Sequence, residues 1–76
     1  MKKNETPIES EKLVELGKKI AVLRKKAGLS QFALPLETNI SKTHISDIEK
    51  GRRNLSYLTL LRIANGLGVS VKDLIP

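Results

Sequence analysis

The sequence predicts an all-α fold, a bundle of five helices containing a helix-turn-helix. Apolar residues recur at helical spacing, Ser precedes most of these stretches, Gly follows them, and strand-like alternation is absent from the sequence. The chain has 76 residues, which is enough for one modest core. We expect a flexible segment at residues 1–8 and one domain at residues 9–76, without room for a separate ligand-binding or catalytic domain.

The first helix is predicted from about Glu9 to the residue before Gly28. Ser10 or a neighbour would cap it, and Lys25 and Lys26 stand in its last turn, where the helix dipole favours cations. One face of this helix holds apolar residues at intervals of three and four: Leu13, Leu16, Ile20, Leu23 and Ala27.

Two shorter helices follow. Ser30 would cap the second, at residues 31–37, and Ser41 the third, which runs to about Lys50. Between them lies a turn at residues 38–40, in which Asn39 tolerates the left-handed conformation. This is a helix-turn-helix, and a basic loop follows it, an arrangement that places one helix in the major groove of DNA.

The third helix would bury Ile45 and Ile48, with Ile40 covering its entry and Gly51 ending it. The fourth helix is predicted from Tyr57 to Leu67, capped by Ser56 and ended by Gly68. Its core stripe consists of Leu60, Ile63, Ala64 and Leu67. Ser70 and Asp73 form a capping box for a short fifth helix, whose apolar residues are Leu74 and Ile75.

The chain is basic, with a net charge of +6 and a pI near 9.9. Eight basic and five acidic groups lie in residues 1–38, and six and three in residues 39–76, so the excess is not a basic tail. Such a charge favours a polyanionic partner, although solubility alone also favours a net charge. The absence of Cys, of a secretory signal and of a long apolar run indicates a soluble protein of the cytoplasm, without a membrane partner.

Three motifs cover most of residues 16–74: AVLRKKAGLSQ at 21–31, ISKTHISDIEKGRRN at 40–54 and LLRIANGLGVSVKDL at 60–74. They resemble the phage repressor and Cro-like helix-turn-helix regulators, which have the lambda repressor-like fold. Residues 43–54 in so short a chain also resemble the controller proteins of restriction–modification systems. One departure is Pro35 in the second helix, where proline removes a hydrogen bond, so we expect that helix to be bent or partly 3₁₀.

The outward face of the third helix is the predicted base-reading surface. Lys42 can donate to guanine, Thr43 can contact a thymine methyl group, and Asp47 can accept from cytosine. The alternative is that these positions are merely solvated. The candidates for base contacts are Lys42, Thr43, Ser46 and Asp47.

Other residues are candidates for the DNA backbone. The second helix would direct its N-terminus and Gln31 at a phosphate, as the resemblance also implies. Arg52 and Arg53 are adjacent arginines without acidic neighbours, a type of pair that holds phosphate, although a solubilising loop is the alternative. His44 would touch phosphate or sugar or stand in solvent, and it has no partner ligands for a metal. The predicted backbone contacts are Gln31, His44, Arg52, Arg53 and Asn54.

The resemblance implies that Arg24 and Glu49 form a partly buried ion pair between helices. Both follow core residues in the sequence, which supports a structural role. The resemblance also implies a homodimer, and small domains of this type usually read two half-sites about 34 Å apart. Apolar residues near the C-terminus are candidates for the interface or, alternatively, for the core: Leu58, Leu61, Val69, Leu74 and Ile75.

The leading hypothesis is a dimeric transcription regulator of a palindromic double-stranded DNA operator. The resemblance to controller proteins implies that it regulates its own gene and a neighbouring endonuclease gene, with RNA polymerase as a further partner. The alternatives are a phage-type repressor and an antitoxin or other protein-interaction module. An enzyme is not expected, since the sequence offers no nucleophile–base pair, phosphate-binding Gly loop, metal cluster, cofactor site or small-molecule site.

Overall fold

The computed structural model describes residues 7–76, and all regular structure in that range is helical. In chain order the elements are α1 (Pro7–Lys26), α2 (Ala33–Thr38), α3 (Lys42–Glu49), α4 (Tyr57–Leu67) and the 3₁₀ helix η1 (Val71–Asp73). The all-α prediction is confirmed. The count of five is not, because four α-helices are present and a three-residue 3₁₀ turn stands where the fifth was expected.

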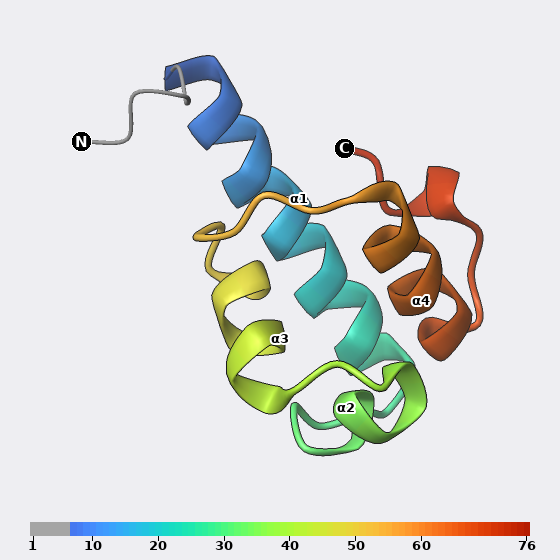
Figure 1. The fold of residues 1–76 in the computed structure, drawn as a ribbon. Helices are drawn as coiled ribbons and strands as arrows, with labels where there is room; N and C mark the ends of the chain where they lie inside the picture. Colours follow the sequence, from blue (N-terminus) through green and yellow to red (C-terminus); the bar gives the residue numbers. More distant parts are fainter. Residues whose placement is uncertain (1–6) are drawn as a thin grey trace.

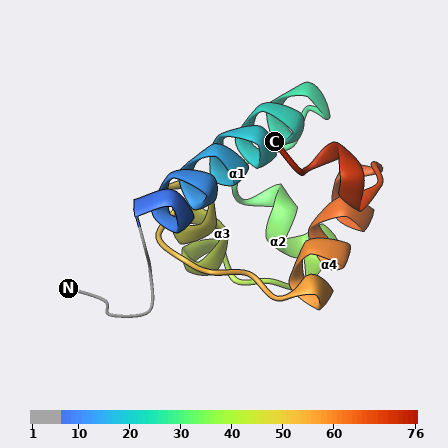
Figure 2. The ribbon, with the colours of Figure 1, turned by 90° about the horizontal axis from the view of Figure 1, so that it is seen from above.

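The long helix α1 runs through the molecule, with α3 on one side and α4 on the other (Figure 1). Helix α3 packs against α1, while α2 packs against α4 and α3. Seen from above, α2 lies between α3 and α4, and the 3₁₀ helix η1 closes against α4 (Figure 2). The two helices of the predicted motif are therefore held by the two longest helices of the fold.

Helix α1 begins earlier than predicted. Pro7 is its first residue, a position where proline is favoured because the missing N–H would have no helical acceptor. Ser10 consequently lies inside the helix and does not cap it. The predicted flexible segment lies outside the described residues except for Pro7 and Ile8, which belong to the first turn of α1. At the other end, Ala27 was wrongly assigned to the core, since it follows the helix and is exposed.

Helix α2 begins later than predicted, at Ala33. The Ser30 hydroxyl still accepts hydrogen bonds from the backbone N–H of Phe32, at 3.2 Å, and of Ala33, at 3.0 Å, across the preceding turn. Pro35 is the third residue of this six-residue α-helix. The Leu34 N–H donates to the Ser30 carbonyl at 3.1 Å, and the next helical bond, from residue 35 to the Gln31 carbonyl, is the one that proline cannot make, so α2 begins only at Ala33. The expected 3₁₀ character lies in the turn before α2, where the Ala33 N–H also donates to the Ser30 carbonyl at 3.1 Å.

The turn between α2 and α3 has the predicted form. Asn39 adopts the left-handed conformation with φ of 60° and ψ of 33°. The buried Thr38 hydroxyl donates to the Leu34 carbonyl at 2.8 Å and accepts from the Ile40 N–H at 3.3 Å, which satisfies the backbone on both sides. Ser41 then caps α3, accepting from the His44 N–H at 3.2 Å. These local bonds fix the angle between the two helices.

The bounds of α4 are as predicted. Ser56 caps it through the Thr59 N–H at 3.1 Å, and Gly68 ends it with φ of 72°. The predicted capping box is present after it, with Ser70 and Asp73 bonded to each other. Hydrogen bonds from the Ser70 backbone and hydroxyl hold the pKa of the Asp73 carboxyl below its ordinary value.

The core lies where α1 to α4 meet. Its members are Ile20, Leu34, Ile40, Ile45, Ile48, Ile63, Ala64, Leu67 and Leu74. Leu74 corrects an expectation, because it is fully buried within one chain and is not available as a dimer contact. Gly17 lets α1 approach α3 closely, since a Cβ at this position would lie 2.6 Å from the Glu49 carbonyl oxygen.

Candidate nucleic-acid interface

The outer face of α3 is polar, and its inner face is anchored. Ile45 is fully buried and Ile48 nearly so, which fixes the rotation of the helix about its axis. Lys42 and Thr43 at the N-terminus are exposed as predicted. The remaining candidates for base contacts, Ser46 and Asp47, are half-buried one turn later. The candidate surface for the DNA groove is thus the first turn of α3, with Lys42 and Thr43, and the same helix face one turn later, with Ser46 and Asp47.

A buried ion pair joins α1 to the end of α3. Arg24 Nε donates to Glu49 Oε2 at 2.7 Å and Nη2 to Oε1 at 3.2 Å, and Nη1 donates to the Leu29 carbonyl at 2.9 Å. The Arg24 and Glu49 side chains are 10% and 7% exposed. The pair that the family resemblance implied is therefore present, and it is structural in that it ties the end of α3 to α1.

Gln31 is bonded to the same carboxylate. Its Nε2 donates to Glu49 Oε1 at 2.9 Å, which holds the half-buried side chain beside the start of α2. His44, the other candidate outside the loop, is also half-buried and follows Thr43 on α3. Gln31 thus supports a side chain of α3, which is a role that the family resemblance also implies for this glutamine.

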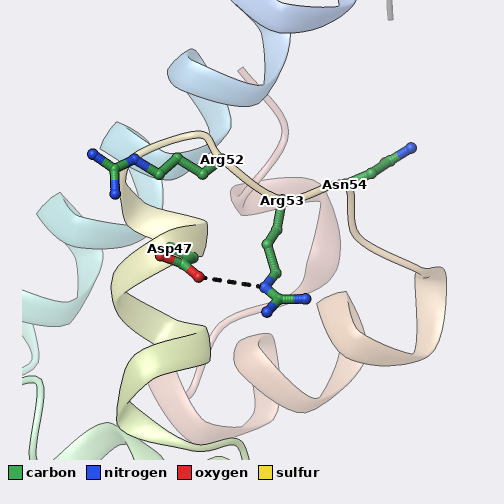
Figure 3. Close-up of a pocket in the computed structure, with 4 residues that line it drawn as sticks. All are labelled: Asp47, Arg52, Arg53 and Asn54. Carbon is green, nitrogen blue, oxygen red and sulfur yellow. Dashed lines mark ion pairs between the residues drawn. The ribbon is translucent and has the colours of Figure 1, made fainter. Parts of the chain in front are cut away.

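The loop after α3 carries three exposed polar residues, Arg52, Arg53 and Asn54. Together with Asp47 they line an open pocket, and Figure 3 shows Arg53 turned toward Asp47 while Arg52 and Asn54 point away. Arg53 Nε lies 3.6 Å from Asp47 Oδ2. The prediction that these arginines lack acidic neighbours is therefore wrong for Arg53, because a separation of six residues across the helix end brings the carboxylate beside it.

Phe32 was not singled out from the sequence. Its side chain is 73% exposed, and Lys42 Nζ lies 4.9 Å from the centroid of its ring. The sequence does contain an indication: Phe32 is the only phenylalanine, and it directly follows Ser30 and Gln31, at a position that the predicted core of the motif does not include.

The five candidates for a dimer interface divide by burial. Leu58 is 66% exposed and Ile75 is 52% exposed, so both present apolar surface to solvent. Leu61 is half-buried, and Val69 is partly buried against the core. With Leu74 in the core, the candidates for the interface that are exposed lie at the start of α4 and after η1.

No group of three or more potential metal ligands occurs among the described residues. Helices long and apolar enough to span a membrane are likewise missing from the part of the chain that the structure describes.

Two short helices joined by a left-handed turn, with polar side chains on the outer face of the second and a cationic loop after it, define a helix-turn-helix DNA-binding protein. The chain belongs to the helix-turn-helix family, whose model matches residues 20–74. The matched range extends from the last two turns of α1 through η1, so it includes α2, α3 and α4 completely.

Three similar proteins are control or controller proteins by name. Control protein C.BamHI of Bacillus amyloliquefaciens is 42% identical over 60 residues, which are 78% of this chain and 74% of that protein. Control protein C.MunI of Mycoplasma sp is 37% identical over 62 residues, 80% of this chain and 84% of that protein. The crystal structure of the restriction-modification controller protein C.AhdI from Aeromonas hydrophila gives a TM-score of 0.81 at 30% identity, covering 83% of this chain and 96% of that one. The resemblance noted from the sequence is confirmed.

Proposed function

We propose that the protein is a restriction–modification controller, a transcription regulator that binds a palindromic double-stranded DNA operator as a homodimer. The observation that carries this proposal is the outer face of α3, where exposed Lys42 and Thr43 stand on a helix whose opposite face is locked into the core by Ile45 and Ile48. The similarity to named control proteins supports the biological setting.

Base reading falls to the first two turns of α3. Lys42 donates to guanine O6 or N7, and Thr43 contacts a thymine methyl group or a base acceptor. Ser46 and Asp47 follow one turn later, with Asp47 able to accept from cytosine N4. Because Asp47 also pairs with Arg53, its carboxylate is partly neutralised, which reduces its repulsion of nearby phosphates.

Backbone contacts flank this surface on both sides. Gln31 lies at the approach to α2, and Arg52, Arg53 and Asn54 lie in the loop beyond α3, so phosphates before and after the groove each meet polar side chains. His44 adds a sugar or phosphate contact from α3 itself. These contacts fix the register of α3 without reading sequence.

Dimerisation supplies the second half-site. Leu58 and Ile75 expose apolar surface that a second copy would cover. In a dimer that reads two adjacent half-sites, the two α3 helices lie about one turn of DNA apart, ~34 Å. Leu61 and Val69, which are partly buried within one chain, are the further candidates for this contact.

Regulation then follows the concentration of the protein in the cytoplasm. As the resemblance to controller proteins implies, the protein activates its own gene and a neighbouring endonuclease gene at low concentration and represses at high concentration. Activation requires a surface that contacts RNA polymerase.

The test is a footprint of the purified protein on DNA upstream of its own gene. Protection of two symmetric half-sites at nanomolar protein is the expected result, because paired half-sites and direct base contacts give specific affinities of about 10⁻⁸ to 10⁻¹¹ M. Diffuse, salt-sensitive protection without a preferred site would contradict the proposal and favour a protein partner for the same fold, as in an antitoxin.

A further inference from the structure

A cation–π contact joins the approach to α2 with the first residue of α3. Lys42 Nζ lies 4.9 Å from the centroid of the Phe32 ring, within the range over which an aromatic face attracts a cation. Phe32 is the only phenylalanine of the chain, and 73% of it is exposed. The ring therefore contributes little to the core, and its contact lies on the surface that carries the base-reading residues.

The position of Lys42 explains what the ring supplies. Lys42 is the first residue of α3, where the positive end of the helix dipole disfavours a cation. The first turn of α3 holds no acidic residue, and none of the described residues forms an ion pair with Lys42. The electron-rich face of the Phe32 ring attracts the Lys42 ammonium group and so keeps it near the N-terminus of α3.

We infer that Phe32 is a positioning residue for Lys42, and that discrimination at the base pair read by Lys42 depends on an aromatic ring at position 32. The inference rests on the proposed function, since it concerns how the proposed DNA surface is prepared. A lysine side chain has four flexible bonds, and holding it before DNA arrives reduces the conformational freedom lost when it reaches a guanine.

The first test compares Phe32→Leu, which keeps apolar bulk and removes the aromatic face, with Phe32→Tyr, which keeps the face. Affinity is measured by fluorescence anisotropy for the footprinted operator and for a set in which each base pair is replaced in turn. We expect Phe32→Leu to bind the operator roughly two- to fivefold more weakly and to lose discrimination at one base pair by a similar factor. Phe32→Tyr should retain the wild-type affinity for the operator and the wild-type discrimination at that base pair.

The matched control is Val22→Ala, which truncates another exposed apolar side chain, on α1. It should leave affinity and discrimination unchanged. A uniform loss for Phe32→Leu across all operators, without a change at any single base pair, would overturn the inference, as would full retention of discrimination.

A double-mutant cycle identifies the partner. If Phe32 acts through Lys42, the Phe32→Leu substitution should have no effect in a Lys42→Ala background. Additive losses from the two substitutions would show that the ring acts independently, and would overturn the inference.

The contact is also measurable without DNA. Proton NMR should show the Lys42 ε-methylene protons shifted upfield by the ring in the wild type and in Phe32→Tyr, but not in Phe32→Leu. Unshifted protons in the wild type would overturn the inference. If the wild type selects no DNA site, the proposed function fails and the inference fails with it; if the wild type selects a site and Phe32→Leu reads it equally well, the inference alone fails.

Discussion

Glu49 receives hydrogen bonds from residues in two other segments of the chain. Arg24 reaches its carboxylate from α1 with two nitrogens, and Gln31 reaches it from the turn before α2. Since the Arg24 and Glu49 side chains are 10% and 7% exposed, each charge depends on the other for compensation. The Glu49 carboxylate therefore holds α1, α3 and Gln31 in place beside the proposed DNA surface, although it is not itself a candidate for contact with DNA.

We predict that Glu49→Ala destabilises the fold by about 3 kcal/mol, because it leaves the Arg24 guanidinium buried without a counter-charge. Urea unfolding measures the loss. Lys12→Ala is the control: its pair with Glu15 is exposed at 3.4 Å, and its removal should change stability by less than about 1 kcal/mol. A loss for Glu49→Ala no larger than that of the control would refute a structural role for the pair.

We predict that Arg53→Ala weakens binding to all DNA sequences alike, because Arg53 is proposed to contact phosphate. The slope of log K against log salt should decrease in magnitude by about 0.9, the value for one lost phosphate contact. Binding titrations over a series of salt concentrations measure it, with Lys19→Ala on α1 as a control of equal charge change. An unchanged slope would place Arg53 away from the phosphates and leave it only its pairing with Asp47.

Among the elements, the packing of α1 on α3 is determined by Gly17. A Cβ there would lie 2.6 Å from the Glu49 carbonyl oxygen and closer still to that of Ile48, so the helices would have to separate. We predict that Gly17→Ala lowers the free energy of unfolding by about 1–3 kcal/mol through overpacking. Alanine favours an isolated helix by about 1 kcal/mol over glycine, so a net loss shows that packing prevails over propensity.

Thermal unfolding of Gly17→Ala beside Lys18→Ala, an exposed neighbour on the same helix, measures this difference. If the Gly17→Ala variant were more stable than the wild type, the backbones of α1 and α3 would have to lie farther apart than the 2.6 Å separation of a Cβ from the Glu49 carbonyl oxygen implies.

The capping box of η1 gives a pH-dependent contribution to stability. The folded pKa of Asp73 lies below its ordinary value, so its stabilisation is present above the unfolded pKa of about 3.9 and is lost as pH falls through the folded value. We predict that Asp73→Asn lowers the melting temperature at pH 7 and that the difference from the wild type shrinks below about pH 4. A difference that stays constant through this range would show that the Asp73 charge is not responsible.

The sequence predicted elements best where a local signal marked each end. Ser56 and Gly68 delimit α4 correctly, because both act through bonds within one turn. The start of α2 was misplaced, because Pro35 has no N–H to donate to the Gln31 carbonyl, so a turn capped by Ser30 precedes the regular helix. The start of α1 was missed, because proline marks a first helical residue as well as a loop.

Contacts between distant segments were harder to predict. Leu74 and Ile75 are adjacent apolar residues, yet one is fully buried and the other is 52% exposed, a difference that depends on how η1 folds back on α4. The Asp47–Arg53 and Phe32–Lys42 contacts cross the ends of helices, where periodicity gives no information about proximity. The candidate base-reading surface could be outlined from the sequence, but its supporting contacts could not.

For the whole molecule, the proposed dimer depends on the exposed apolar residues of the C-terminal half, Leu58 and Ile75. We predict that Leu58→Glu converts the proposed dimer to a folded monomer, because a charge would be buried at the interface while the residue is 66% exposed within one chain. Sedimentation measures the mass, and operator binding should weaken by at least tenfold.

Val22→Glu introduces the same charge at an exposed apolar position of α1 and serves as the control. A wild-type protein that sediments as a monomer at micromolar concentration, or a Leu58→Glu variant that remains dimeric, would move the interface elsewhere.

The two faces of α3 carry different tasks, which affects how helix-turn-helix proteins of this fold can diverge in sequence. Ile45 and Ile48 maintain the fold, whereas Lys42 and Thr43 are exposed and contribute little to the core. Substitutions at the exposed positions therefore have small effects on stability, so selection can exchange them freely. If the proposed base contacts hold, a few substitutions in the first turn of α3 keep two regulators of this fold from acting on each other's promoters, while the scaffold stays the same.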